Sequence, residues 1–514
     1  MGASSETDPT CVSRLAPSSE RGVWRYAKAD KARVIVDAAD YFGCMQNAMS
    51  KAERRILLIG WDFDTRIHLA HGRKWWQRAW KRGYPRRLGG FIGWLVRHRP
   101  ALEVRILKWS YGAFTLFTRG AMWIDVLRWV RHPRIKFRFD TAHPVACSHH
   151  QKIAVIDNRL AVCGGIDMTD GRWDTRDHRE DNPERHTVRR SRYAPWHDAT
   201  MMLQGDVAAA LADLGQDRWI CAGGDDFDAL PDTTADLWPD KLDVAFENVE
   251  VGIARTRAAH REWDAVHEIR DLFLAHIARA QRFIYAESQY FASRAIADAI
   301  LARLQEPDPP EIAIVHPANA DGWLEQQAMD HIRAELVTVI EAADKDDRFS
   351  LWCPYSGETP IYVHAKIMIV DDEVLRIGSA NLNNRSMGLD SECDVFIDAA
   401  RPGNGHAGEG IAKLRHSLMA EHCGVEEDAI PALLEKYGSM RALFEAEASD
   451  GSRTLRRYHP PELNGIASTL AKSQLLDPEH PEEMFEPFAK GGLFREGSRL
   501  GRIRARLLRR KTRE

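Results

Sequence analysis

Residues 150–157 read HQKIAVID, and residues 364–371 read HAKIMIVD. Both segments place His, Lys and Asp at the same spacing, and both carry the apolar run of a buried β-strand. Side chains two residues apart lie on the same face of a strand, so His150 and Lys152 share one face. The same holds for His364 and Lys366. A strand that occurs twice with the same chemistry predicts a duplicated fold.

The agreement continues downstream of each motif, at the same distances from the histidine. The matched pairs are Gly164 with Gly378, Gly165 with Ser379, and Asp167 with Asn381. A single His-Lys-Asp triple can arise by chance in a chain of 514 residues, but two triples with the same following glycine indicate an internal repeat.

Short apolar runs alternate with amphipathic segments in both halves, which is typical of an α/β protein. We therefore predict two duplicated α/β/α domains with mixed sheets, packed face to face, and an active site at their interface. The first helix is expected over 34–50. The expected divisions are a mobile leader (1–22), an N-terminal domain (23–250), a C-terminal domain (251–424) and a helical and loop-rich extension with a basic tail (425–514).

Composition indicates a soluble or peripherally attached protein of a reducing compartment, and we expect a cytoplasmic location. The eight cysteines are scattered and form no C-x-x-C pair, which argues against a disulfide framework or a cysteine zinc site. The first residues, MGASSETDPT, lack the apolar core of a signal peptide, and no apolar run is long enough to span a bilayer. The net charge of −4 does not favour nucleic acid as a partner.

Two imidazoles and two ammonium groups in one cleft suit transfer at a phosphodiester. The lysines can hold the anionic oxygens and stabilise charge in the transition state. One neutral histidine can attack phosphorus to form a phosphohistidine, and the other can protonate the leaving alkoxide. This chemistry requires no metal and no other cofactor.

The longer segments around the motifs resemble the phospholipase D superfamily, and within it the catalytic core of the eukaryotic-type phospholipases D. The resemblance covers roughly residues 30–425 and rests on six stretches: HHQKIAVID followed by GGIDMTDGRWD, PWHD, IYAESQYF, and HAKIMIVD followed by GSANLNNRSMGLDSE. It implies that the substrate is a phospholipid and that the reaction is either hydrolysis or transfer of the phosphatidyl group to an alcohol.

The resemblance also implies roles for individual residues. His150 matches the nucleophile, His364 the general acid and base, and Glu392 the acid that orients His150. Asp198, in PWHD, is the candidate for orienting His364. Asp157 and Asp371 complete the motifs and are expected to support the ends of their strands. The expected substrate-binding set, beside the catalytic Lys152 and Lys366, is Asn381, Ser379, Gly165, Asp167 and Gln289.

Several alternatives stay open at this point. A cardiolipin-synthase-like phosphatidyltransferase has the same motifs, and so does a catalytically silent lipid-binding module on the same fold. Nucleases with this motif carry it once per chain, which disfavours them here. We expect a monomer. The basic tail at 499–514 is expected to contact an anionic membrane surface, and the Trp-rich stretch at 74–87 is either a second membrane patch or a loop over the core.

Overall fold

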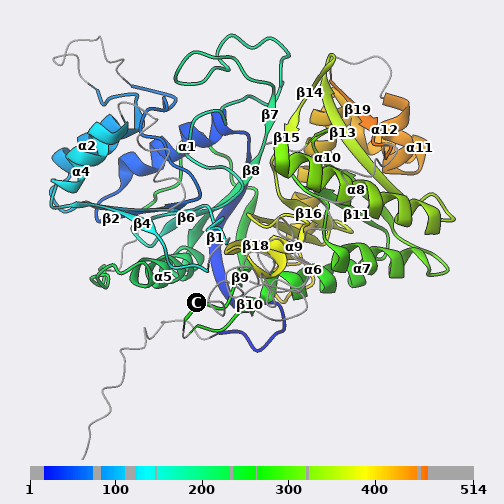
Figure 1. Cartoon of the computed structure of the whole chain (residues 1–514), viewed down its shortest axis with the longest axis horizontal. Coiled ribbons are helices and arrows are strands. Elements are labelled where there is room, and N and C mark those ends of the chain that lie inside the picture. The colour runs from blue at the N-terminus through cyan, green and yellow to red at the C-terminus, as the bar shows by residue number, and fades with distance from the viewer. Residues whose placement is uncertain are drawn as a thin grey trace, which may run out of the picture.

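The computed structural model describes residues 17–72, 83–109, 122–144, 147–231, 235–261, 263–319, 323–447 and 453–460. The basic tail at 499–514 and most of the Trp-rich stretch (74–82) lie outside these residues. Figure 1 shows the two halves of the chain side by side, with β1 (Arg25–Val36) and β9 (Phe246–Arg257) running between them.

Among the described residues, seven strands of each half follow the same spatial order in the sheet. In the first half the order is β4 (Ile135–Asp140), β3 (Glu103–Trp109), β2 (Arg55–Gly60), β5 (Ile153–Ile156), β6 (Leu160–Gly164), β8 (Ala199–Gly205) and β1. Strands β2, β3 and β4 are parallel, and the remaining pairings are antiparallel. The result is a mixed sheet.

The second half repeats this order from its own outer edge. It runs β13 (Phe349–Ser356), β12 (Glu311–Val315), β11 (Phe283–Glu287), β16 (Ile367–Val370), β17 (Val374–Gly378), β18 (Glu392–Asp398) and β9. Strand β1 pairs antiparallel with β9, so hydrogen bonds join the two half-sheets into one continuous sheet. The predicted division between residues 250 and 251 falls inside β9.

Helices cover both halves in a matching way (Figure 1). The first half carries α1 (Ala38–Lys51), α2 (Leu88–His98), α4 (Met122–Val130) and α5 (Asp206–Cys221). The second carries α6 (Glu268–Arg279), α7 (Arg294–Leu304), α8 (Trp323–Ala343), the short α9 (Asn384–Gly388) and α10 (Ala407–Cys423). The smaller elements are β7 (Trp196–His197), β10 (Val266–His267), β14 (Thr359–Pro360), β15 (Tyr362–Val363) and η2 (Glu427–Ala429).

A central apolar core joins the two halves. It includes Ile153 and Val155 from β5 together with Ile367 and Ile369 from β16, all buried. Separate cores lie between each half-sheet and its outer helices. The predicted α/β fold with a duplicated domain is confirmed. The hydrogen-bonded pairing of β1 with β9 also joins the two half-sheets, which the motif alone does not predict.

The predicted helix at 34–50 is wrong at its start. Val34, Ile35 and Val36 belong to β1, where they pair with β8. These β-branched side chains favour a strand, and β8 supplies the hydrogen bonds of this segment. The helix begins at Ala38, after Asp37 turns the chain with a φ of 65°.

The ends of the described chain pack against the second half. Arg21, in the predicted leader, forms an ion pair with Asp271 of α6 at 3.0 Å. Helices α11 (Ile430–Tyr437) and α12 (Met440–Glu447) lead into β19 (Arg453–Arg457), which pairs with β13. Residues 1–16 and 461–514 lie outside the described residues, so the extent of the leader and of the extension stays a prediction.

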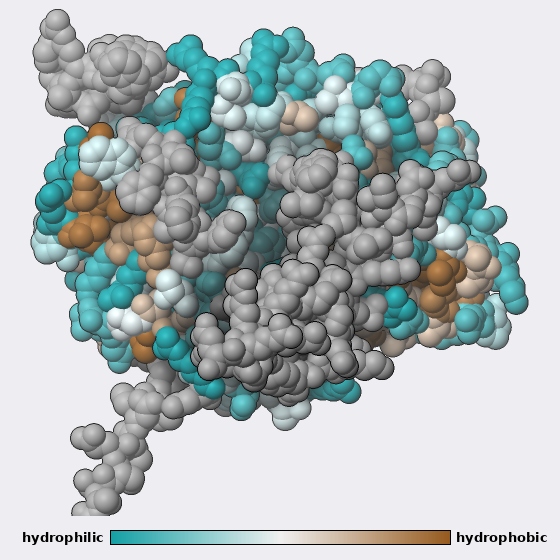
Figure 2. All heavy atoms as spheres, in the orientation of Figure 1, coloured by the Kyte–Doolittle hydropathy of each residue, from teal (hydrophilic) through white to brown (hydrophobic). Residues whose placement is uncertain are grey.

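Apolar side chains gather on one part of the surface. Figure 2 shows brown atoms on the left, where Figure 1 places α2 and α4. Helix α4 exposes Trp123 and Val130, with 45% and 64% of their surface accessible, and also Ile124 and Leu127. None of the described helices is long and apolar enough to cross a membrane.

Candidate active site

The two motif histidines meet between the two halves of the molecule. Each lies just before its strand, His150 ahead of β5 and His364 ahead of β16. Their ring centroids are 6.5 Å apart. The backbone N–H of His150 donates to the carbonyl of Ser391 at 2.9 Å, and that of His364 donates to the carbonyl of His197 at 2.7 Å. Each motif is therefore held by backbone of the opposite half.

The imidazole of His150 contacts a buried acid from the second half. Its Nδ1 lies 3.1 Å from Oε2 of Glu392 and 3.0 Å from the carbonyl oxygen of Ser379. A carbonyl oxygen only accepts hydrogen bonds, so Nδ1 carries the proton. In the neutral ring this leaves the lone pair on Nε2, the form that acts as a nucleophile.

His364 has the reciprocal arrangement. Its Nδ1 lies 2.7 Å from Oδ2 of Asp198, which comes from the first half. The other oxygen of Asp198 accepts from the backbone N–H of Ala199 at 2.8 Å. A Cβ atom on Gly165 would lie 2.1 Å from that same oxygen, Oδ1, so only glycine leaves room for the acid here. Gly165 thus shapes the position of Asp198.

Burial controls the protonation of these pairs. It raises the pKa of Asp198 to about 7, although the nearby Lys366 lowers it, and it raises the pKa of Glu392 to about 8 against the hydrogen bond from Ser379. Burial and the nearby lysines hold the pKa of both histidines well below 6.5. Carboxyl and imidazole shift in opposite directions because burial disfavours the charged form of both partners in each pair.

The two motif lysines differ in their surroundings. Lys152 Nζ lies 3.4 Å from Oδ2 of Asp167, whereas Lys366 Nζ donates to Oε1 of Gln289 at 3.3 Å. Burial lowers the pKa of Lys366 to about 7, and Asp198 opposes that shift. Asp167, expected to bind substrate, therefore forms an ion pair with Lys152, whereas Lys366 contacts an uncharged amide.

The other expected substrate-binding residues lie around the same space. Ser379 donates its hydroxyl to Glu392 Oε2 at 2.5 Å, so it supports the acid. Gln289 donates to the hydroxyl of Tyr362 at 2.9 Å. Asn381 is buried, and its Oδ1 has no hydrogen bond among the described residues. Its amide therefore keeps hydrogen-bonding capacity for a ligand.

The motif aspartates lie at the other end of their strands. The carboxylate of Asp157 accepts three backbone N–H bonds, from Glu53, Arg54 and Arg55, at 2.7 to 2.8 Å. Asp371 does the same with the chain at 281–283, at 2.6 to 2.8 Å. These contacts tie the start of β2 and of β11 to the turn after each motif strand, which is a structural role.

Three further residues contact the site and are not named by the sequence analysis. Ser386 donates to Glu392 Oε1 at 2.7 Å, as a second hydroxyl on that acid. The ring of Trp196 lies beside that of His364, with the two centroids 5.3 Å apart. The guanidinium of Arg172 lies over the Trp196 ring, 4.1 Å from its centroid. All three stand within stretches that carry the resemblance, and that position is the only signal in the sequence.

Comparison with known proteins agrees with this geometry. The family model described as Phospholipase D matches residues 116–298 and 352–459, and the model described as Cardiolipin synthase, PLD-like domain matches residues 273–405. The chain is 23% identical to phospholipase D delta of Arabidopsis thaliana over 83% of its own length and 67% of the relative's. It is 24% identical to phospholipase D alpha 1 of Zea mays, over 74% and 63%.

The chain thus spans about two thirds of the length of these plant relatives. Among solved structures, phosphatidylserine synthase of Haemophilus influenzae Rd KW20 superposes with a TM-score of 0.50 at 12% identity, over 84% of this chain and 97% of that one. This likeness concerns the fold alone. The Phospholipase D model covers more than half of the chain, and the chain belongs to the phospholipase D family.

Proposed function

We propose that this protein is a phospholipase D-type enzyme that hydrolyses glycerophospholipids or transfers their phosphatidyl group through a covalent phosphohistidine. One observation carries the proposal: the half-buried His150 and the buried His364 lie 6.5 Å apart between their rings, and each is held at Nδ1 by an acid from the opposite half. This crossed arrangement leaves the Nε2 atoms of both rings available to one phosphodiester group, His150 for phosphorus and His364 for the leaving oxygen.

In the first step Nε2 of His150 attacks phosphorus, and the bond from phosphorus to the head-group oxygen breaks. The proton on Nδ1, held by Glu392 and the carbonyl of Ser379, keeps the lone pair on Nε2. His364 donates its Nε2 proton to the leaving oxygen. Asp198, at 2.7 Å, stabilises the imidazolium form of His364 before that transfer.

In the second step water or an alcohol loses its proton to His364 and attacks the phosphohistidine. The bond between phosphorus and His150 Nε2 breaks, and the product is phosphatidate or an exchanged phospholipid. We assign Lys152, Lys366 and the side-chain N–H groups of Asn381 to the non-bridging oxygens in both steps. Lys152 forms an ion pair with Asp167, and burial lowers the pKa of Lys366 to about 7, so we assign charge stabilisation to both lysines together.

Two observations support a lipid as the substrate. The plant relatives are phospholipases D by name, and the apolar face of α4 exposes Trp123, Ile124, Leu127 and Val130. Exposed aromatic and aliphatic side chains on one helix suit contact with a lipid surface. The basic tail at 499–514, outside the described residues, remains a proposed second contact with anionic lipid.

The experiment is a transfer assay with labelled phosphatidylcholine vesicles and ethanol. We expect phosphatidate and phosphatidylethanol, and we expect both products to disappear in His150→Ala. Phosphatidylethanol is diagnostic because water and ethanol compete for one phosphatidyl-enzyme. Vesicle binding without turnover of any phosphodiester, unchanged in His150→Ala, would instead identify a silent lipid-binding module.

A phosphatidyltransferase that uses a lipid alcohol is the second candidate, and the match of residues 273–405 to the cardiolipin synthase model favours it. The same assay separates the two when phosphatidylglycerol replaces ethanol as the acceptor. Formation of cardiolipin in preference to phosphatidate would make transfer the principal reaction. Phosphatidate as the dominant product would support the hydrolase.

A further inference from the structure

A second group of charged side chains lies behind the catalytic pair, outside the phosphodiester chemistry. Asp37, His178, His197 and Glu421 each direct one nitrogen or oxygen to a common point, with these atoms all within 4.8 Å of one another. All four side chains are at most 4% exposed. Three come from the first half, and Glu421 comes from α10 of the second. We call these four residues the buried tetrad.

Two separations in the buried tetrad match those of ligands around a small cation, and the two that involve Glu421 are shorter, at hydrogen-bonding distance. His178 Nε2 lies 3.4 Å from an oxygen of Asp37 and 3.0 Å from one of Glu421. His197 Nδ1 lies 3.5 Å from Asp37 and 2.9 Å from Glu421. Ligands at about 2.0–2.2 Å from a tetrahedral zinc ion are about 3.4 Å from each other. Movements of a few tenths of an ångström would complete this geometry.

Two buried atoms of the tetrad, Nδ1 of His197 and Oδ2 of Asp37, have no partner among the described residues except ion pairs with other members of the tetrad. Their side chains are 1% exposed or less. A buried polar atom needs a partner, because leaving it without one is costly. These two atoms therefore depend on the tetrad itself, or on an ion held within it.

The outer partners have the pattern found around bound metals. His178 contacts Asp174 through Nδ1 at 3.0 Å, and His197 contacts Glu287 through Nε2 at 2.7 Å. In each ring the outer nitrogen meets a carboxylate, and the inner nitrogen faces the tetrad. Metal-binding histidines nearly always donate their other N–H to such a partner, which directs the lone pair toward the ion.

We propose that the buried tetrad is a structural site for a divalent transition-metal ion, with Zn²⁺ as the best fit. Two imidazoles and two carboxylates suit this ion, and a closed set of four protein ligands is typical of a structural site. Two carboxylates also balance its charge. The ion would join α10 to the first half and so lock the two halves together.

The site would also act on the active centre through the backbone. Asp37 Oδ1 accepts from the backbone N–H of Asp198 at 3.1 Å, and Asp198 follows His197 directly in the chain. Asp198 in turn holds His364. The ion would therefore help to position His364 through Asp37 and Asp198, and it would not take part in the reaction itself.

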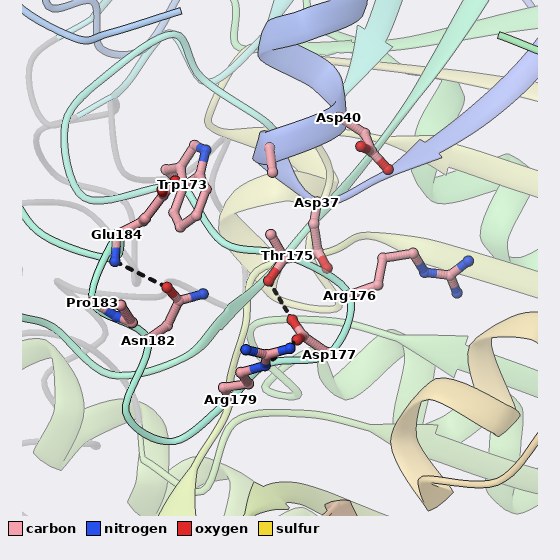
Figure 3. A pocket seen from close by; sticks show the side chains of 11 residues that line it. Asp37, Asp40, Trp173, Thr175, Arg176, Asp177, Arg179, Asn182, Pro183 and Glu184 are labelled. Carbon is pink, nitrogen blue, oxygen red and sulfur yellow. Dashed lines mark hydrogen bonds and ion pairs between the residues drawn. The ribbon is translucent and has the colours of Figure 1, made fainter. Parts of the chain in front are cut away.

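A surface pocket gives the buried tetrad an entry path. Figure 3 shows this pocket, of about 650 Å³, with Asp37, Asp40 and Arg176 on one side and Trp173, Asn182 and Glu184 on the other. Asp37 belongs both to the pocket wall and to the tetrad. Arg176, which contacts the second oxygen of Glu421, also lies at this boundary. The pocket is lined by the acidic Asp40, Asp177 and Glu184 as well as by Arg176 and Arg179.

The test uses the full-length protein and needs no substrate. Metal analysis after loading with Zn²⁺ and exhaustive dialysis is expected to give about one ion per chain. Replacement with Co²⁺ is expected to give the intense visible bands of a tetrahedral site with nitrogen and oxygen ligands. A chelator is expected to lower the Tm of the loaded protein, and Zn²⁺ to restore it.

Glu421→Gln and His178→Ala are expected to lose both the ion and the chelator effect. His276→Asn is the matched control, because it removes a buried imidazole of α6 that packs on Phe396 and lies outside the buried tetrad. It is expected to keep one ion per chain. If both tetrad variants fail to fold, the Co²⁺ spectrum of the wild type still decides.

A wild-type chain with substoichiometric metal and no tetrahedral Co²⁺ bands would overturn the proposal. The buried tetrad would then be an ion network of protonated imidazoles and carboxylates. Since none of these readouts involves turnover, they stand or fall independently of the proposed phospholipase D activity.

Discussion

Replacing Asp198 by Asn tests whether His364 acts as the general acid. The change keeps the size of the side chain and removes its charge. In the wild type Asp198 Oδ2 lies 2.7 Å from His364 Nδ1, and both side chains are buried. Breaking a buried charge pair by removing one partner costs about 3–5 kcal/mol, and each 1.4 kcal/mol is about a tenfold change in rate. We expect kcat for phosphatidylcholine to fall about 10²- to 10³-fold.

The leaving group makes this prediction specific. Choline leaves as a basic alkoxide and needs a proton, whereas p-nitrophenolate leaves without one. In a stopped-flow burst with phosphatidyl-p-nitrophenol, the first step of Asp198→Asn is therefore expected to be within about tenfold of the wild-type rate, because the acid contributes little there. The phosphohistidine would then accumulate, since His364 is still needed to deprotonate water.

Equal losses of burst rate with both substrates would refute this reasoning. They would mean that Asp198 acts on the position of His150 or on phosphate binding, and not through the proton of His364. Glu392→Gln is the matched variant on the other side of the site. It is expected to slow the burst with both leaving groups, because Glu392 contacts the nucleophile His150.

Three further variants test the rest of the geometry. Asp157→Asn weakens three backbone hydrogen bonds, so we expect a loss of about 1–3 kcal/mol in the free energy of unfolding with kcat of the folded enzyme retained; a large loss of kcat at unchanged Tm would contradict the structural role. Gly165→Ala places a Cβ atom 2.1 Å from Asp198 Oδ1, so we expect at least a hundredfold loss of kcat, whereas Gly405→Ala, with no atom within 4 Å, should behave as wild type in the same assay. Lys366 titrates near pH 7 in the folded protein and near 10.4 when unfolded, so the unfolded state binds the extra proton between these values. Chemical denaturation should therefore show the wild type gaining stability relative to Lys366→Met from about pH 7 to 10, and a gain on acidification would show that the lysine pKa is not lowered.

The duplicated architecture could be predicted from the sequence because the repeat is local. The alternation of HQKIAVID and HAKIMIVD, and the shared spacing of Gly164 and Gly378, need only neighbouring residues to be read. The resemblance then added Glu392 and Asp198, and the structure places both at Nδ1 of the histidines named with them. The helix start at 34–50 was misjudged because three β-branched residues take their hydrogen bonds from a distant strand, β8.

The tertiary structure decided which side chains share an environment. Asp167 stands where the second copy has Asn381, and only its 3.4 Å contact shows that it forms an ion pair with Lys152. Glu392 and Asp198 appear as ordinary acids in the sequence, but burial raises the pKa of Glu392 to about 8 and that of Asp198 to about 7.

The buried tetrad is the clearest case of this division. Its members, at positions 37, 178, 197 and 421, have no common spacing, and no pair of them forms a local metal-binding pattern. They meet because the turn between β1 and α1, the loop before β7, β7 itself and α10 converge where the two halves pack. A chemical motif on one strand can be read from the order of residues, whereas a site built from four separate segments depends on the packing of the whole chain.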